Sequence, residues 1–363
     1  MSGTSPVPSL AAGSASPLTA AHDVALLDLD GVVYVGPDAV PGVPWALQEV
    51  RRAGMRLGFV TNNAARTPED VAAHLTELGI TADAADVITS SQAAATVVAG
   101  LLGPGARVLA VGGPGVATAM RAAGLVVVER AEDEPAAVVQ GYGREVGWAQ
   151  LAEAVVAVRN GARHVATNAD ATIPSPRGPL PGNGAMVGVV RAVTGQEPLV
   201  TGKPDPAMHA ECVRRTGAHR PLVVGDRLDT DIEGARRAGA AGLLVFSGVT
   251  DPRTLLAAPP VQRPDHLAPD AGGLLAAHPA VDRTGTGWRC GSWEARSAEG
   301  DALLLVDTAP ETGARAAGDG LDGLRALCVA HWARHPGQGA PARVLADGPA
   351  ATAVLRAWEL ADA

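Results

Sequence analysis

The stretch that most constrains this chain is Val24-Ala-Leu-Leu-Asp-Leu-Asp-Gly-Val-Val-Tyr34. Its four apolar residues, Val24–Leu27, form a run short enough to be a strand buried in a parallel sheet. Because side chains alternate along a strand, Asp28 and Asp30 leave it on the same side. Gly31 then allows the backbone to turn sharply and to come close to a ligand.

Carboxylates at the carboxyl end of such a strand lie where open α/β sheets bind their ligands. One carboxylate can attack as a nucleophile while the other moves a proton. A strand followed by an Asp-rich turn is the simpler alternative for this stretch alone. The rest of the chain has to decide between the two interpretations.

The residues that follow predict alternating helices and strands. A helix over 45–53 starts after Pro44 and stops at Gly54, which is the usual placement of these two residues. A strand over 55–60 comes next and ends in Thr61-Asn62-Asn63, and Thr67 caps a further helix that has acids in its first turn. Strand–helix–strand–helix is the pattern of a parallel sheet, so the fold class is α/β.

The same alternation runs through a second unit before the first resumes near Leu199-Val200. We infer one domain interrupted by an insertion, because the site-like residues fall on either side of it. The predicted division is a disordered tail (1–21), a core domain (22–87 and 197–278), an inserted α/β cap (88–196) and a small C-terminal α+β domain (281–363). Residues 251–280 are rich in Pro and Ala and are expected to include a linker. The remaining predicted helices are 93–101, 115–123, 148–158, 207–216, 231–238 and 321–333, and the remaining predicted strands are 107–111, 125–128, 137–139, 164–166, 222–224, 243–246, 288–295, 302–306 and 342–345.

Composition excludes several classes of protein. The net charge of −9, without a basic block, argues against a nucleic-acid binder. The three cysteines lie far apart with no CxxC spacing, so they predict neither a disulfide framework nor a zinc site, and buried or idle thiols are expected. Residues 2–20 carry no charge and no continuous apolar core, unlike a secretory signal, and no segment is long enough to cross a membrane. We therefore expect a cytoplasmic protein.

Four sets of polar residues follow at predicted element boundaries: Asp28-x-Asp30-Gly, Thr61-Asn-Asn, Gly-Lys203-Pro and Gly-Asp226-x₄-Asp231. Each set alone is weak evidence for a function. Their order along the chain, however, resembles that of the motifs of the haloacid dehalogenase superfamily, whose phosphatases form an aspartyl phosphate. More narrowly, DLDGVVY, TNN, TGKP and GDRLDTDI resemble its class IIA (NagD-like), which carries a large α/β cap between the second and third motifs. The resemblance implies a Rossmann-like core with an inserted C2-type cap.

The resemblance also implies roles for these residues. Asp28 is the nucleophile, and Asp30 protonates the leaving alcohol and then deprotonates water. Thr61, Asn62, Asn63 and Lys203 bind the phosphate, with Lys203 as a compact positive charge. These roles suit phosphate monoesters, whose slow hydrolysis requires a positioned nucleophile and neutralised phosphoryl oxygens.

A sparse set of oxygen ligands suits Mg²⁺, which keeps several waters and bridges to the phosphate. By resemblance the ligands are the carboxylates of Asp28 and Asp226 and the main-chain carbonyl of Asp30. Asp231 is expected to orient waters on the metal. Asp229, in the same loop, is expected to be an ordinary solvated carboxylate.

Substrate specificity is expected to lie in the insertion, since the core chemistry serves many substrates. The resemblance points to the loop that leads through Asn168 and Asp170 toward Arg177, and these three are candidate substrate contacts, although each could equally hold the shape of the loop. Relatives that act on pyridoxal phosphate carry His one place before the proline of this loop. Ile173 stands there in this chain, which counts against that substrate.

Two further motifs resemble binding loops but fit them poorly. The stretch from Val108 to Gly115 resembles a dinucleotide-binding turn, but it lacks the GxGxxG spacing, so a plain turn is the better interpretation. Arg334-His-Pro-Gly-Gln-Gly339 matches the Arg-x-x-Gly-x-Gly loop of acetyltransferases that bind acetyl-CoA, yet here a helix precedes the loop and a strand follows it. An appended region of this size resembles the acetyltransferase-like (GNAT-like) part of actinobacterial glycerol-3-phosphate phosphatases.

The sequence thus predicts a Mg²⁺-dependent phosphatase of small phosphate monoesters, with glycerol 3-phosphate favoured and a role in glycerophospholipid metabolism. The alternatives within the class are 2-phosphoglycolate and a nucleoside monophosphate. The alternative from another class is a phosphatase-fold sensor whose C-terminal domain binds acyl-CoA or a partner. We expect a small phosphorylated substrate, no nucleic-acid or membrane partner, and a homodimer as one candidate assembly.

Overall fold

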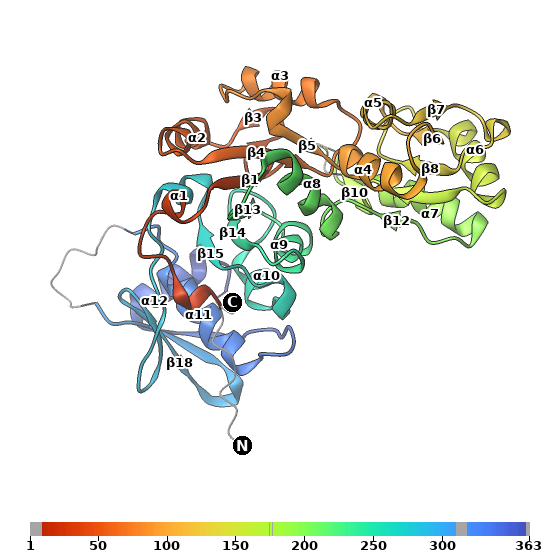
Figure 1. Cartoon of the computed structure of the whole chain (residues 1–363). Helices are drawn as coiled ribbons and strands as arrows, with labels where there is room; N and C mark the ends of the chain where they lie inside the picture. The colour runs from red at the N-terminus through yellow and green to blue at the C-terminus, as the bar shows by residue number, and fades with distance from the viewer. Residues whose placement is uncertain (1–8, 174, 176, 310–317, 361–363) are drawn as a thin grey trace. The chain divides into compact units, whose positions relative to one another are not determined.

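The computed structural model describes residues 9–173, 175, 177–309 and 318–360 (Figure 1). Its contacts divide the chain into two compact units. The first unit combines the two ends of the chain, Met1–Leu57 and Arg220–Ala363, and the second is the intervening Gly58–His219. No helix within the described residues is long and apolar enough to cross a membrane.

The first unit contains a parallel arrangement of four strands. Their order is β15 (His266–Ala268), β14 (Ala241–Val245), β13 (Pro221–Gly225) and β1 (Val24–Asp28). The apolar residues of β1 are fully buried, as expected for a strand covered on both faces. The helices and short elements of this part are α2 (Val43–Arg52), the hairpin β2 (Tyr34–Val35) and β3 (Asp38–Ala39), η4 (Leu228–Ile232), α9 (Glu233–Arg237), α10 (Pro252–Leu256), η5 (Pro260–Gln262) and η6 (Ala271–Leu275).

The C-terminal region of this unit is a second sheet covered by helices. Its strands are β16 (Asp282–Arg283), β17 (Gly287–Cys290), β18 (Trp293–Ser297), β19 (Leu303–Asp307) and β20 (Val344–Asp347), antiparallel except for the parallel pair β19–β20. Helices α11 (Asp322–Arg334) and α12 (Gly348–Ala357) pack against it, and η7 (Glu299–Asp301) joins β18 to β19 (Figure 1). The α+β composition predicted for this region is therefore confirmed.

One prediction in the first unit is wrong, and two of its elements, β15 and α12, were not predicted. The predicted single strand 288–295 is the hairpin β17–β18, because Gly291 turns the chain with a positive φ of 54°. Residues 251–280, which were expected to include a linker, also contain β15, which pairs with β14 as a strand of the sheet. Helix α12 was not predicted at all.

The predicted disordered tail is also wrong for residues 9–21, while residues 1–8 lie outside the described part. This segment forms η1 (Ser9–Ala12) and α1 (Leu18–Ala21), in which Leu10 is 2% exposed and Leu18 is fully buried. Ser14 and the buried His278 exchange main-chain hydrogen bonds of 2.8 and 2.9 Å. Two leucines among small residues give no periodic signal, so only their long-range contacts reveal the order.

The second unit contains the cap sheet, which has five parallel strands in the order β12 (Leu199–Val200), β9 (Arg163–Ala166), β8 (Ala137–Gln140), β6 (Arg107–Val111) and β7 (Val126–Val128). Two apolar clusters cover its two faces. Val108 of β6 packs in the cluster that includes α4 (Ser90–Leu102) and α5 (Pro114–Ala122). Leu109 and Val111 pack in the cluster that includes α6 (Trp148–Arg159) and α7 (Asn183–Thr194).

The remaining elements of the chain's described part belong to the second unit, apart from the first two residues of β4. They are β4 (Arg56–Thr61), which pairs in parallel with β5 (Val87–Thr89), α3 (Pro68–Glu77), η2 (Ala84–Asp86), η3 (Ala131–Asp133), the hairpin β10 (Thr172–Ile173) and β11 (Leu180–Pro181), and α8 (Pro206–Thr216). Thr67 caps α3 as predicted, in a reciprocal capping box with Asp70. The core was expected to resume at Leu199, but β12 still belongs to the cap sheet because it pairs with β9.

All three cysteines are buried and free, as expected. Cys212 lies on the inner face of α8, where burial raises the pKa of its thiol to about 12. Such a thiol is not a nucleophile at neutral pH.

Candidate active site

The first unit brings together three carboxylates at the carboxyl ends of two neighbouring strands. Asp28 is the last residue of β1, and Asp226 directly follows β13, which pairs in parallel with β1. One carboxylate oxygen from each of Asp28, Asp226 and Asp231 lies within 4.8 Å of the others. Asp226 and Asp231 are each only 1% exposed, so we call these three residues the acidic cluster.

Glycines allow the backbone to close around Asp226. A Cβ atom on Gly31 would lie 2.4 Å from Asp226 Oδ2, and one on Gly248 would lie 2.0 Å from the same oxygen. The main-chain N–H of Val249 donates to this oxygen at 2.7 Å. The Asp-x-Asp-Gly motif therefore needs its glycine because the turn after β1 runs directly against the Asp226 carboxylate.

Asp231 reaches the cluster from a widened helical turn. The predicted helix 231–238 starts earlier, as the π-helical turn η4, and continues as α9. Asp231 Oδ2 accepts a hydrogen bond of 3.2 Å from the main-chain N–H of Arg227, and a Cβ on Gly225 would lie 2.1 Å from Asp231 Cβ. Single π turns are frequent at functional sites, and this one turns Asp231 back toward the end of β13.

The other acids of this region lie closer to solvent. Asp30 is exposed and forms an isolated bridge with Tyr34 at the start of the β2–β3 hairpin. Ser247 fixes the same turn by donating its hydroxyl to the Gly31 carbonyl at 2.7 Å. Asp229 has a 60% exposed side chain and pairs with Arg227 at 2.9 Å, which confirms that it is a solvated carboxylate.

The acidic cluster fits a divalent cation. Three carboxylates held this close repel one another, and burial of two of them adds a desolvation penalty. A cation removes both costs, and a set of hard oxygen donors is what Mg²⁺ prefers.

The second unit brings together Asn62, Lys203 and the cap loop residues Asn168 and Asp170. The Asn62 side chain accepts from the Lys203 main-chain N–H at 2.9 Å and donates to the Lys203 carbonyl at 3.2 Å. It also donates to Asp170 Oδ2 at 3.2 Å, while Asn168 donates to the Asn62 carbonyl at 2.7 Å. The Asn62 amide is thus used on both sides to hold three segments together.

Thr61 and Asn63, the neighbours of Asn62 in the chain, shape the turn that follows β4. Thr61, at the end of β4, is 3% exposed and accepts from the Asn63 main-chain N–H at 3.0 Å. Asn63 in turn accepts from the Ala65 main-chain N–H at 3.0 Å. These contacts fix the backbone directly after the strand, where phosphate-binding groups are expected.

The cap loop candidates differ in their surroundings. Asn168 is 3% exposed, and its Oδ1 accepts from the Asp170 main-chain N–H, so it holds the shape of the loop. The buried Asn183 supports it by donating to the Asn168 carbonyl at 2.8 Å. Arg177 is exposed and lies outside this group of hydrogen bonds; its main-chain N–H donates to the Ser175 hydroxyl.

Sequence reasoning missed two serines that support the Thr61–Asn63 turn. Ser90 donates its hydroxyl to the Asn62 carbonyl at 2.7 Å, and Ser91 donates to the Ala64 carbonyl at 2.9 Å. Both are fully buried in the first turn of α4. The signal available was a pair of serines at the start of a mostly apolar helix, which is too common to identify a site.

Comparison with known proteins identifies the family to which this chain belongs. The family model for haloacid dehalogenase-like hydrolases matches residues 25–126, a second HAD-hydrolase-like model matches residues 200–274, and a GCN5-related N-acetyltransferase-like domain matches residues 290–360. The chain belongs to the haloacid dehalogenase-like hydrolases, as its motifs predicted. The acetyltransferase-like nature of the C-terminal region is confirmed as well.

Particular relatives narrow this class to phosphatases. The chain is 44% identical over 352 residues to D-glycerol 3-phosphate phosphatase of Mycobacterium tuberculosis, covering 93% of this chain and 94% of the relative. It is 38% identical over 227 residues to acid sugar phosphatase of Staphylococcus aureus, covering 62% of this chain and 86% of the relative. Among solved structures, glycerol phosphate phosphatase from M. tuberculosis in complex with magnesium matches with a TM-score of 0.84 and 42% identity, covering 95% of this chain and 99% of that chain.

Proposed function

We propose that this chain is a Mg²⁺-dependent phosphatase that hydrolyses glycerol 3-phosphate to glycerol and phosphate. The observation that carries the proposal is the acidic cluster of Asp28, Asp226 and Asp231, which offers a nucleophile beside a set of metal ligands. The near full-length similarity to a D-glycerol 3-phosphate phosphatase supports the choice of substrate. A role in glycerophospholipid metabolism follows from that substrate.

In the proposed reaction the Asp28 carboxylate attacks phosphorus and the ester oxygen leaves, so that the phosphoryl group is bound to Asp28. Asp30 protonates the leaving alcohol and then takes a proton from the water that cleaves the aspartyl phosphate. The exposure of Asp30 is compatible with this exchange, because the group must reach both alcohol and water.

The phosphoryl oxygens carry negative charge throughout and need matching donors. Thr61, Asn63 and Lys203, together with the main chain of Asn62, are proposed to supply them. Because the Asn62 amide already bonds to Lys203 and Asp170, we assign to Asn62 the placement of Lys203 rather than a side-chain contact with phosphate.

The proposed ligands of Mg²⁺ are the carboxylates of Asp28 and Asp226 with the Asp30 main-chain carbonyl, and Asp231 orients bound water. When bound, the ion neutralises charge on the phosphate and on the acidic cluster. The Val249 N–H and the glycines around Asp226 keep that carboxylate in place before any ion arrives.

The predicted division into core (22–87 and 197–278), cap (88–196) and C-terminal domain (281–363) accompanies this proposal. In it, Asp170 and Arg177 are cap residues that face substrate, and Asn168 holds their loop. A cytoplasmic location and a homodimer stay predictions from sequence.

The test measures Mg²⁺-dependent phosphate release from glycerol 3-phosphate, 2-phosphoglycolate and AMP by wild type, Asp28→Asn and Asp229→Asn. Loss of the nucleophile in Asp28→Asn should lower kcat/KM by at least about a thousandfold. Asp229→Asn is the matched control in the same acidic region, and should stay within about twofold because an exposed ion pair contributes little. Turnover near wild type in Asp28→Asn would refute the mechanism, and a preference for either other ester would refute the substrate.

A further inference from the structure

The loop that matches the acetyltransferase motif, residues 334–339, packs against a core segment of the same unit. A Cβ atom on Gly339 would lie 2.5 Å from the Ala257 carbonyl oxygen and 3.1 Å from the Pro259 nitrogen. The last glycine of the motif is therefore needed because two main chains meet there. The proposed function leaves this motif without a role, so its contacts are the starting point of the inference.

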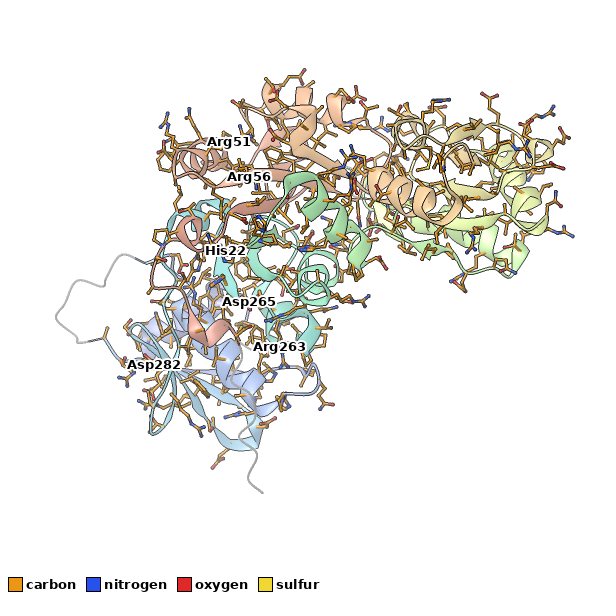
Figure 2. All side chains as sticks on the ribbon, viewed as in Figure 1. His22, Arg51, Arg56, Arg263, Asp265 and Asp282 are labelled. Atoms are coloured by element: carbon orange, nitrogen blue, oxygen red, sulfur yellow. The ribbon has the colours of Figure 1, made fainter. Side chains whose placement is uncertain are left out.

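Arg263 enters this loop from the core side (Figure 2). Its side chain is buried, and its guanidinium donates to the carbonyls of His335 and Gln338 at 2.7 and 2.9 Å. Its Nε donates to the Ala258 carbonyl at 3.1 Å. Arg263 Cζ also lies 5.4 Å from the centroid of the Trp332 ring, within the range of a cation–π contact. Three carbonyl groups and an aromatic ring thus hold the cation.

This arginine is buried without a counter-ion. Within the part of the chain that the structure describes, its polar partners are these three carbonyls, and no carboxylate pairs with it. Burial of an unpaired charge is unfavourable, even where its N–H groups find acceptors. A guanidinium does, however, fix the positions of its acceptors, because its donors form a rigid planar fork. Arg263 therefore sets the geometry between loop 334–339 and the segment before it.

The same segment holds the helix that follows the Asp231 turn. Gln262, the neighbour of Arg263, donates from its side-chain amide to Glu233 Oε2 at 2.8 Å. The main-chain carbonyl of Arg263 accepts from Arg236 Nε at 2.9 Å. Glu233 and Arg236 both lie on α9, which continues η4 without a break. We call Gln262 and Arg263 the strut, because they join α9 to loop 334–339.

The position of α9 determines that of Asp231. Glu233 comes only two residues after Asp231, and the intervening Ile232 is fully buried in a cluster that includes Trp332. A π turn is rarely adopted, so its geometry depends on the groups packed around it. A shift of α9 would therefore move the Asp231 carboxylate away from the 4.8 Å group that it forms with Asp28 and Asp226.

We propose that Gln262 and Arg263 are positioning residues for the metal site, with the acetyltransferase-like loop as the anchor of Arg263. The proposal rests on the proposed function, in which Asp231 orients water on Mg²⁺. Loss of a group directly behind a metal ligand lowers metal affinity by about 10- to 100-fold, and the strut acts one step further away. The motif thus serves an intramolecular contact that supports the acidic cluster.

The test measures the Mg²⁺ affinity of the full-length protein by isothermal titration with MgCl₂. Gln262→Ala removes the hydrogen bond to Glu233, and Arg263→Met removes the fork but keeps an apolar stem against Trp332. Each should weaken Mg²⁺ binding by about three- to tenfold. The double variant should weaken it no more than the stronger single change, because both act through α9. The KM for glycerol 3-phosphate at saturating Mg²⁺ should stay within about twofold of wild type, since neither residue is proposed to touch substrate.

Arg253→Met is the matched control. Arg253 is exposed and donates to the Glu359 carbonyl at 2.7 Å, so it also joins the core to the C-terminal region, but it lies outside the strut. It should keep the wild-type Mg²⁺ affinity, and hydrogen exchange of residues 226–237 should rise in the strut variants alone. The half-buried Gln262 decides the question by itself if Arg263→Met does not fold.

Wild-type Mg²⁺ affinity in both strut variants would overturn the proposal, and so would an equal loss of affinity in Arg253→Met. The proposed function fails separately: if wild type binds Mg²⁺ but releases no phosphate from glycerol 3-phosphate, weaker Mg²⁺ binding in the strut variants still supports the strut.

Discussion

Two sheets of this chain carry charged side chains just after the carboxyl ends of their parallel strands. The side chains are acidic in the first unit and include an arginine in the cap. After β1 and β13 the first unit places Asp28 and Asp226, which with Asp231 form an acidic cluster in which Asp226 and Asp231 are buried. After β6 and β8 the cap places glycines and an exposed Arg144 around an open cavity. The same backbone geometry therefore carries three carboxylates in one sheet and an arginine with glycines in the other, and the residues just after the strands decide which.

The two sheets also differ in what supports them. The cap sheet is covered on both faces by clusters drawn from its own unit. In contrast, Leu228 and Ile232, which flank Asp231 on η4, share a cluster with Trp332 and Leu324 of the C-terminal region. The turn that carries Asp231, which is proposed to orient water on the metal, thus packs against a region that the sequence predicted to be a separate domain.

Two buried arginines extend this support. Arg263, labelled in Figure 2, is 7% exposed and donates to the carbonyls of His335 and Gln338 at 2.7 and 2.9 Å. It therefore occupies the loop that matches the acetyltransferase motif. Arg325 is 1% exposed, pairs with Asp319 and donates to the Leu267 carbonyl at 2.7 Å.

The largest effect is expected at the acidic cluster, the proposed metal site of the first unit. Asp226→Asn should abolish Mg²⁺-dependent phosphate release, because it removes a ligand from the acidic cluster. In wild type, Mg²⁺ at about 100 times its Kd should raise the free energy of unfolding by about 2.7 kcal/mol, and this gain should vanish in the variant. Thermal melts with and without Mg²⁺ measure it. Equal stabilisation of both proteins would place the ion elsewhere.

A second test concerns the support of the acidic cluster. Trp332 is 1% exposed, and Trp332→Ala should lower the free energy of unfolding by about 3–5 kcal/mol through the cavity it leaves. The matched control is Trp148→Ala in the cap, where the side chain is 85% exposed and little should change. In Trp332→Ala, hydrogen exchange should accelerate more in residues 220–360 than in residues 88–200. A larger acceleration in the cap would contradict the inference that the C-terminal region supports the acidic cluster and that the cap is supported by its own unit.

The smallest expected effect is in the pH dependence of stability. Burial, aided by the neighbouring His278, lowers the pKa of His266 to about 4. The unfolded chain protonates this group near its ordinary pKa of about 6.5, so the stability held by neutral His266 is lost as pH falls from about 6.5 to about 4. His266→Gln should reduce the slope of the unfolding free energy in this window by about 1 kcal/mol per pH unit, seen in urea melts. An unchanged slope in His266→Gln would show that the group is not held neutral.

Local patterns determined the elements and the motifs. The α/β alternation, the Thr67 cap and the boundaries of β6 followed from apolar runs, Pro and Gly placement and capping residues, all of which act over a few residues. The motif order around Asp28, Lys203 and Asp226 was sufficient to predict the family. These features could be found because their physical causes are short-range.

Only the tertiary structure decided what is brought together and what supports it. The order of residues 9–21, the assignment of β12 to the cap sheet and the hairpin at Gly291 depend on contacts between segments far apart in the chain. The same holds for the use of the Asn62 amide, for the cavity beside Arg66 and Arg144, and for the core shared by η4 and α11. No local pattern encodes such contacts, because burial and pairing are properties of the packed chain.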